Sequence, residues 1–112
     1  MEHEAVKYIE ENYPQTAKCF KAIQHEQYVL FCKKQKDYGS GNIAMGTSLK
    51  NKEDIRFSLT ALSIRMNDKI QRLLNLFKKQ LTPENESIED AFQDLSVYGI
   101  IARIVSEGSW GK

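Results

Sequence analysis

Residues 55–77 read IRFSLTALSIRMNDKIQRLLNLF, and their apolar side chains recur every three or four residues. The recurring positions are Ile55, Leu59, Leu62, Met66, Ile70, Leu73 and Phe77. This spacing places one apolar side chain per turn on a single face of an α-helix, whereas a half-buried strand would alternate at every second residue. The stretch therefore predicts one long amphipathic helix over about residues 52–80.

The rest of the chain predicts helices as well. A short helix over about residues 3–12 precedes a longer one over about residues 14–37, because proline is favoured at a first helical position. Thr82 as N-cap and Pro83 at the next position predict a fourth helix over about residues 82–107. No segment alternates in the manner of a strand. We therefore expect an all-α fold, a small bundle of three main helices and a short N-terminal helix.

Two segments are predicted to lie outside these helices. Residues 37–51 are rich in glycine, asparagine and serine and predict a flexible loop, and loops of this length are usually functional or disordered. Residues 108–112 predict a short tail, in which Trp110 is either disordered or an apolar contact to a neighbouring subunit. We expect a single domain over residues 1–112 with a core over about residues 15–107.

The chain has 112 residues and a net charge of +1. This balance excludes bulk electrostatic attraction to nucleic acid or to an anionic membrane, and we expect no sequence-specific DNA binding. No apolar run approaches the roughly 20 residues that span a bilayer, and the acidic N-terminal sequence is unlike a secretion signal. We therefore expect a cytoplasmic protein, with Cys19 and Cys32 as reduced, partly buried thiols.

The length of the predicted third helix bears on assembly. About 29 residues at ~1.5 Å per residue give a helix of ~43 Å, longer than a domain of this size. Such a helix must either kink or contact another subunit. We expect a homodimer or a higher homo-oligomer.

Three cations share one stripe of this helix. Arg65, Lys69 and Arg72 stand at i, i+4 and i+7, beside the apolar positions. Such a stripe can hold phosphate oxygens through charge-assisted hydrogen bonds, or it can bridge to acids on a neighbouring helix. Asp68 can be a metal ligand, a ribose acceptor or a partner of Arg72.

The predicted fourth helix carries carboxylates at one per turn. Glu86, Asp90 and Asp94 stand at i, i+4 and i+8, and Glu89 lies on the same polar side. Carboxylate oxygens in this arrangement can bind Mg²⁺. Acidic residues are also common in the first turn of a helix because they oppose the helix dipole. This explanation does not cover Asp94, which lies two turns into the predicted helix.

A third candidate lies where the second helix meets the loop. Lys36 adds charge, Asp37 offers an acceptor, Tyr38 offers a ring on which a base can stack, and Gly39 lets backbone N–H groups approach an anion. Gly39 can equally be a helix C-cap. The segment matches neither a P-loop nor a dinucleotide-binding fingerprint.

Three segments together carry a resemblance: FCKKQKDYGSGN at 31–42, SIRMNDKIQRLLNL at 63–76 and NESIEDAFQDLSVYGIIARI at 85–104. They resemble the first nucleotide-modification-associated domain family, small helical proteins of phages and prophages. The resemblance covers roughly residues 20–105. The positions that match the family's motifs are Lys36, Asp37, Tyr38, Gly39, Arg65, Asp68, Lys69, Arg72, Glu86, Ser87, Asp90, Asp94 and Tyr98.

This resemblance implies a nucleotide ligand and a phage setting. The last helix is also similar to half of the MazG-type all-α nucleoside triphosphate pyrophosphatases, which place acidic pairs on two helices around Mg²⁺. Here the long helix offers only Asp68, flanked by cations, where a second acidic pair is expected. A site rich in arginine and lysine favours holding a phosphate over hydrolysing it.

We therefore expect a nucleotide-binding protein without catalysis and without a cofactor, which sequesters a nucleotide or cyclic oligonucleotide as an anti-defence sponge in the host cytoplasm. Its ligand-binding residues would be Lys36, Asp37, Tyr38, Gly39, Arg65, Asp68, Lys69 and Arg72. One alternative is a Mg²⁺-dependent pyrophosphatase with Glu86, Asp90 and Asp94 as metal ligands. The other is a helical protein-interaction module that binds through its long third helix.

Overall fold

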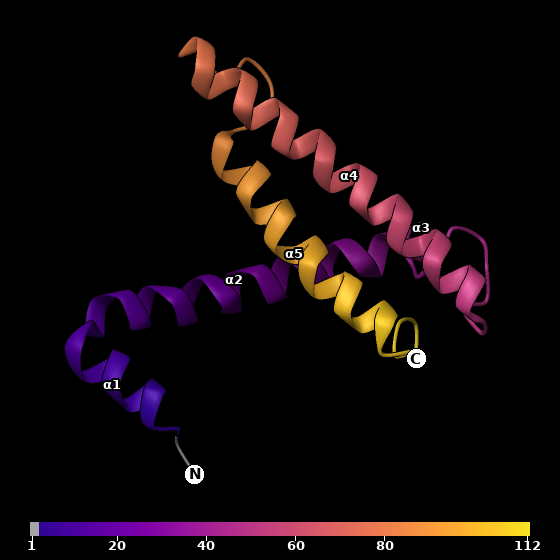
Figure 1. The fold of residues 1–112 in the computed structure, drawn as a ribbon, viewed down its shortest axis with the longest axis horizontal. Coiled ribbons are helices and arrows are strands. Elements are labelled where there is room, and N and C mark those ends of the chain that lie inside the picture. Colours follow the sequence, from indigo (N-terminus) through magenta and orange to yellow (C-terminus); the bar gives the residue numbers. More distant parts are fainter. Residues whose placement is uncertain (1–2) are drawn as a thin grey trace. The chain divides into compact units, whose positions relative to one another are not determined.

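The structure, a computed structural model, describes residues 3–112. These residues form five helices and no strand, so the all-α prediction is confirmed (Figure 1). The helices are α1 (Glu4–Asn12), α2 (Pro14–Tyr38), α3 (Gly41–Ala44), α4 (Lys52–Lys79) and α5 (Ile88–Ser106). Within the described residues, no helix combines the length and the apolar composition needed to cross a bilayer.

The N-terminal helices begin and end where local chemistry predicts. Pro14 is the first residue of α2, where its missing N–H costs nothing. Gly39 follows the helix with a φ of 72°, and its N–H donates to the carbonyl oxygen of Gln35 at 2.8 Å. Gly39 is therefore a helix C-cap, one of the two roles that the sequence left open.

The predicted loop over residues 37–51 contains a short helix, α3, that the sequence analysis missed. Ile43 and Ala44 are buried, with exposed fractions of 2% and 7%. The Ile43 carbonyl oxygen accepts a hydrogen bond of 2.6 Å from the Ser58 hydroxyl of α4. This turn of helix forms because two apolar residues within a polar segment are buried, a tertiary contact that glycine and asparagine content does not reveal.

Helix α4 matches its prediction to within one residue. The side chain of Asn51 caps its start by accepting from the Asp54 N–H at 2.9 Å. It ends at Gln80, which adopts a left-handed φ of 53°, while Lys78 and Lys79 lie at the negative end of the helix dipole.

The predicted start of α5 at Thr82 and Pro83 is wrong. The chain leaves α4 through a hydrogen bond from the Leu81 N–H to the Leu76 carbonyl, and α5 begins only after Ser87, whose hydroxyl accepts from the Asp90 N–H at 3.1 Å. Both sites satisfy the local rules for an N-cap. The intervening residues are needed for the chain to reverse before α5 can pack along α4.

The chain divides into two compact units, the part before Gln35 and the part Gln35–Lys112, with the division inside α2. In the first unit an ion pair between Lys21 and Glu10 links α2 to α1. Cys19 and Cys32 are free thiols, as expected, but both are exposed where partial burial was predicted.

The second unit contains the apolar core. Figure 1 shows α5 running back alongside α4 in the opposite direction. The buried apolar residues are Ile43, Ala44, Leu62, Leu73, Leu76, Ala91, Ile101 and Val105. The predicted apolar face of α4 is only partly used: Leu62 and Leu73 are buried, whereas Ile70 and Phe77 are 43% and 53% exposed.

Candidate functional site

The cationic stripe of α4 faces the rest of the second unit. Arg65, Lys69 and Arg72 are all partly buried, and they lie on the same side of α4 as the buried Ser58 and Leu62. From the sequence, these three side chains could face either the apolar core or the solvent, because the stripe lies at the edge of the apolar face. The structure places them on the inner side, within reach of α3, α5 and the segments that connect them to α4.

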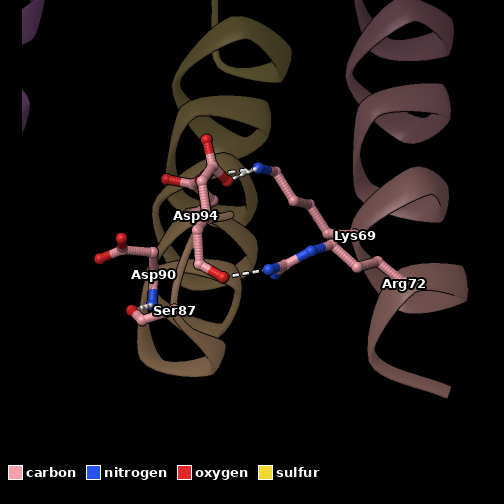
Figure 2. A network of polar contacts seen from close by, with 6 residues as sticks. Lys69, Arg72, Ser87, Asp90 and Asp94 are labelled. Carbon is pink, nitrogen blue, oxygen red and sulfur yellow. Dashed lines mark hydrogen bonds and ion pairs between the residues drawn. The ribbon is translucent and has the colours of Figure 1, made fainter. Parts of the chain in front are cut away.

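Lys69 lies between two carboxylates (Figure 2). Its Nζ is 3.0 Å from Oε2 of Glu86 and 3.0 Å from Oδ2 of Asp94. The side chains of Lys69 and Asp94 are both 21% exposed, so water screens this pair less than it screens a surface pair. The hydrogen bonds that Lys69 donates to Glu86 and Asp94 raise its pKa above the ordinary value. Lys69 is therefore held as an ammonium group by α5 and by the segment before it.

Arg72 contacts the same segment. Its Nη2 donates to the backbone carbonyl oxygen of Glu86, as Figure 2 shows. Its other terminal nitrogen, Nη1, is buried without a hydrogen-bond partner. Arg72 therefore fixes the chain just before α5 and does not pair with Asp68, which is exposed on α4.

The predicted stack of carboxylates on α5 does not form. Glu86 precedes the helix, so it is not one turn from Asp90 on a helical face. Asp90 is exposed and points away from Lys69 and Arg72 (Figure 2), and its backbone N–H is capped by Ser87. Glu89 and Asp90 lie in the first turn of α5, where they oppose the helix dipole.

The three predicted Mg²⁺ ligands, Glu86, Asp90 and Asp94, do not converge on one point in this structure. The Lys69 ammonium already lies between Glu86 and Asp94, and Asp90 points elsewhere. A magnesium ion would have to displace that ammonium and would still find only two of the three predicted ligands nearby. No group of three or more His, Cys, Asp or Glu side chains lies close enough to hold a metal ion in the part of the chain that the structure describes.

Residues 39–42, which join α2 to the first residues of α3 and are called the 39–42 turn below, are held by side chains from three parts of the second unit. Gln35 of α2 donates to the Gly39 carbonyl oxygen at 2.7 Å, and Arg65 of α4 donates to that of Asn42 at 2.9 Å. Trp110 of the C-terminal tail donates through Nε1 to the Ser40 carbonyl oxygen at 3.0 Å. Trp110 thus contacts its own chain, a role that neither prediction for it included.

Next to this turn, the end of α2 is open to solvent. Lys36, Asp37 and Tyr38 are all exposed, and Tyr38 is 67% exposed. Arg65 connects the neighbouring 39–42 turn to α4 through its bond to Asn42. Of the predicted ligand residues, the structure therefore brings Arg65 to the 39–42 turn and brings Lys69 and Arg72 to the start of α5.

Sequence reasoning missed the donors that build this arrangement, Gln35, Ser58 and Trp110. Ser58 had a detectable signal, because it stands one turn before Leu62 on the face of α4 that becomes buried. Gln35 and Trp110 had none, because each lies outside the apolar pattern of a buried helix face and donates to a carbonyl of a turn whose position depends on the tertiary fold.

Comparison of the chain with protein-family models, with curated proteins and with solved structures finds no match. The resemblance to the nucleotide-modification-associated family therefore stays a prediction from three short motifs.

Proposed function

We propose that this protein binds a nucleotide or cyclic oligonucleotide without catalysis, at the end of α2 and the 39–42 turn. The observation that carries the proposal is the juxtaposition of an exposed Tyr38 with a turn that Arg65 and Trp110 hold in place. An exposed aromatic ring offers a stacking surface for a base, and the fixed backbone of the neighbouring turn lowers the ordering cost of binding.

Charge on this side of the second unit suits a phosphate. A guanidinium has five N–H donors in a fixed plane, and the bonds of Arg65 to Asn42 and to the Met45 sulfur both run from its Nη2. Its remaining donors are available to a phosphate beside the 39–42 turn, and the exposed ammonium of Lys36 adds positive charge to the end of α2, two residues before Tyr38. Asp37 supplies an acceptor for a ribose hydroxyl or a base N–H group.

Lys69 and Arg72 receive a different role in this proposal. A phosphate that bound Lys69 would have to displace both Glu86 and Asp94, and one that bound Arg72 would have to displace the Glu86 carbonyl. We assign these two cations to the α4–α5 contact. The same ammonium position weighs against the Mg²⁺-dependent pyrophosphatase alternative.

The biological setting follows from the resemblance alone. A phage protein of this size, acting in the host cytoplasm, would serve as an anti-defence sponge that removes a nucleotide immune signal. A small homo-oligomer suits this purpose because it multiplies the number of sites per particle.

The test is an equilibrium depletion assay. The purified protein is incubated in Mg²⁺ with mononucleotides and cyclic di- and trinucleotides, filtered, and the retained fraction is heated and chromatographed. Intact release of a depleted nucleotide supports the proposal, whereas conversion to a monophosphate and pyrophosphate supports the pyrophosphatase alternative.

Two matched pairs of variants locate the site. Tyr38→Ala and Arg65→Ala should each weaken depletion by about 10- to 100-fold, as expected for a lost stacking contact or charged hydrogen bond. Tyr28→Ala, at a tyrosine of α2 that is 64% exposed, and Arg56→Ala, at an exposed arginine of α4, should leave depletion unchanged. Equal losses in a test variant and its control would contradict the proposed location.

A helical protein-interaction module is a second candidate, favoured by the apolar side chains that α4 leaves exposed. Phe57, for example, is 53% exposed. If no nucleotide raises the Tm even at millimolar concentration, this candidate replaces nucleotide binding, because a ligand at 100 times its Kd should add about 2.7 kcal/mol.

A further inference from the structure

Helix α4 presents a second apolar row that α3 and α5 leave about half exposed. Ile70, Leu74 and Phe77 stand at i, i+4 and i+7 and are 43%, 44% and 53% exposed. On the helix surface they lie about 100° around from the buried Leu73 and Leu76. The row therefore lies beside the buried face of α4, and at Phe77 it also contacts Phe92 of α5.

Two further side chains extend this row into a patch. Leu81, just after α4, is 49% exposed, and Phe92 of α5 is 52% exposed. The Phe92 ring stacks on the Phe77 ring with centroids 6.4 Å apart and an interplanar angle of 27°. We call Ile70, Leu74, Phe77, Leu81 and Phe92 the Phe77 patch.

The Phe77 patch is large enough to form the centre of a protein interface. Five side chains of roughly 200 Å² each, about half exposed, leave about 500 Å² of apolar surface in contact with water. A stable interface buries about 800 Å² on each partner, with an apolar centre and a polar rim. The patch supplies the centre, and its polar neighbours on α4 and α5 supply the rim.

The patch is complementary to itself when the helix direction is reversed. If two α4 helices pack antiparallel about a point between Leu74 and Phe77, Leu74 of each copy lies opposite Phe77 of the other. In the same register Ile70 lies near the C-terminal end of the other copy's α4, which Leu81 follows after the left-handed residue Gln80. Leu74 and Phe77, the two central positions of the row, then each meet an apolar position.

Charge along the edge of the patch is compatible with this register. The flank of α4 away from α5 carries the uncharged Asn67, Gln71 and Asn75, with Lys78 as its charged member. In the antiparallel register Lys78 of one copy lies near Gln71 and Asn75 of the other, so like charges do not meet. The net charge of +1 adds little repulsion between whole chains.

We propose that a second copy of this chain docks on the Phe77 patch, with the two α4 helices antiparallel in an isologous dimer. A closed two-fold contact of this kind uses the same surface on both subunits. This inference rests on the homo-oligomer that the proposed function includes, and it does not depend on nucleotide binding.

The first experiment measures the mass of the full chain by sedimentation velocity over a dilution series. The wild type should be a dimer, and Leu74→Glu should weaken the dimer by at least about 100-fold, because each interface would bury two unpaired carboxylates. Ile64→Glu is the matched control, since Ile64 is an exposed apolar residue of α4 outside the patch, and it should stay dimeric. Circular dichroism establishes that all three chains have the same helix content.

A monomeric wild type would overturn the proposal, and so would a Leu74→Glu variant with the mass of the wild type. Equal dissociation of Leu74→Glu and Ile64→Glu would also overturn it, because the contact would then not be specific to the patch. Nucleotide depletion by Leu74→Glu separates the two proposals: loss of the dimer with retained depletion leaves the nucleotide proposal intact.

A second experiment tests the direction of packing. In a background of Cys19→Ser and Cys32→Ser, the variants Ile70→Cys and Leu81→Cys are oxidised separately and as a mixture. The antiparallel register predicts a disulfide-linked heterodimer in the mixture and little linked homodimer in either sample alone. Linked homodimers of Ile70→Cys alone would indicate parallel helices and overturn the proposed register.

Discussion

Replacement of Ser58 by alanine tests whether the contact between α3 and α4 stabilises the second unit. The Ser58 side chain is fully buried, and its hydroxyl donates to the carbonyl oxygen of Ile43 at 2.6 Å. Ile43 is itself 2% exposed, so water cannot replace the lost donor without a rearrangement of α3. A buried carbonyl that loses its donor destabilises a protein by about 1–3 kcal/mol.

Ser63→Ala is the matched control. Ser63 is exposed on the same helix, and its hydroxyl donates to the Leu59 carbonyl oxygen one turn earlier, where water can take its place. Both replacements gain the same helix propensity, about 0.5 kcal/mol, which cancels in the comparison. Ser58→Ala should therefore be less stable than Ser63→Ala by about 1–3 kcal/mol.

Urea titration followed by tryptophan fluorescence measures this difference in the relevant unit. The chain has one tryptophan, and Trp110 lies in the second unit against the 39–42 turn. A thermal melt should agree, since each kcal/mol lowers the Tm of a unit this size by about 4–8 °C. Equal unfolding free energies for the two variants would refute the view that the Ser58 bond to α3 is a buried, stabilising contact.

Three further predictions concern ionisation and backbone conformation. The carboxylates around Lys69 raise its pKa above the ordinary 10.5, so its contribution to stability is fully present below that value and is lost as the pH rises through the raised pKa. In urea titrations, Lys69→Met should have a lower free energy of unfolding than the wild type, and this difference should shrink as the pH rises through the raised pKa of Lys69. A difference that does not change with pH would contradict this. Gln80→Gly should raise the free energy of unfolding by about 0.5–1 kcal/mol, and with it the urea midpoint, because the φ of 53° at this position favours glycine. Gln71→Gly, inside α4, should lower both. Gly39→Ala should destabilise by about 1–2 kcal/mol because its φ is 72°, while Gly41→Ala, which meets no neighbouring atom, should be tolerated; similar midpoints for the two would show that this conformation carries no strain.

Helix positions were largely predictable because they depend on neighbours in the sequence. Apolar spacing and the end signals around α4 act within one or two turns, and the prediction was correct to within one residue. The prediction for the start of α5 was wrong for the same reason. Thr82-Pro83 and Ser87 both satisfy the local rule for an N-cap, and only the path of the reversing chain selects Ser87.

The direction in which the cationic stripe points was not predictable. Spacing aligned Arg65, Lys69 and Arg72 on one side of α4, but it left open whether they would meet solvent, a ligand or acids of another segment. The contact of Lys69 with Glu86 and Asp94 was among these alternatives, and the packing of α5 selected it.

By itself, the sequence determined an all-α protein, the extent of its long helix and the residues that share each helix face, because these follow from backbone geometry and residue spacing. Only the tertiary structure decided which faces are buried, because that depends on residues far apart in the chain. Trp110 and the Ser40 carbonyl, 70 residues apart, meet only after α5 has packed on α4. The same packing leaves the Phe77 patch exposed, since one neighbouring helix covers only part of the circumference of α4.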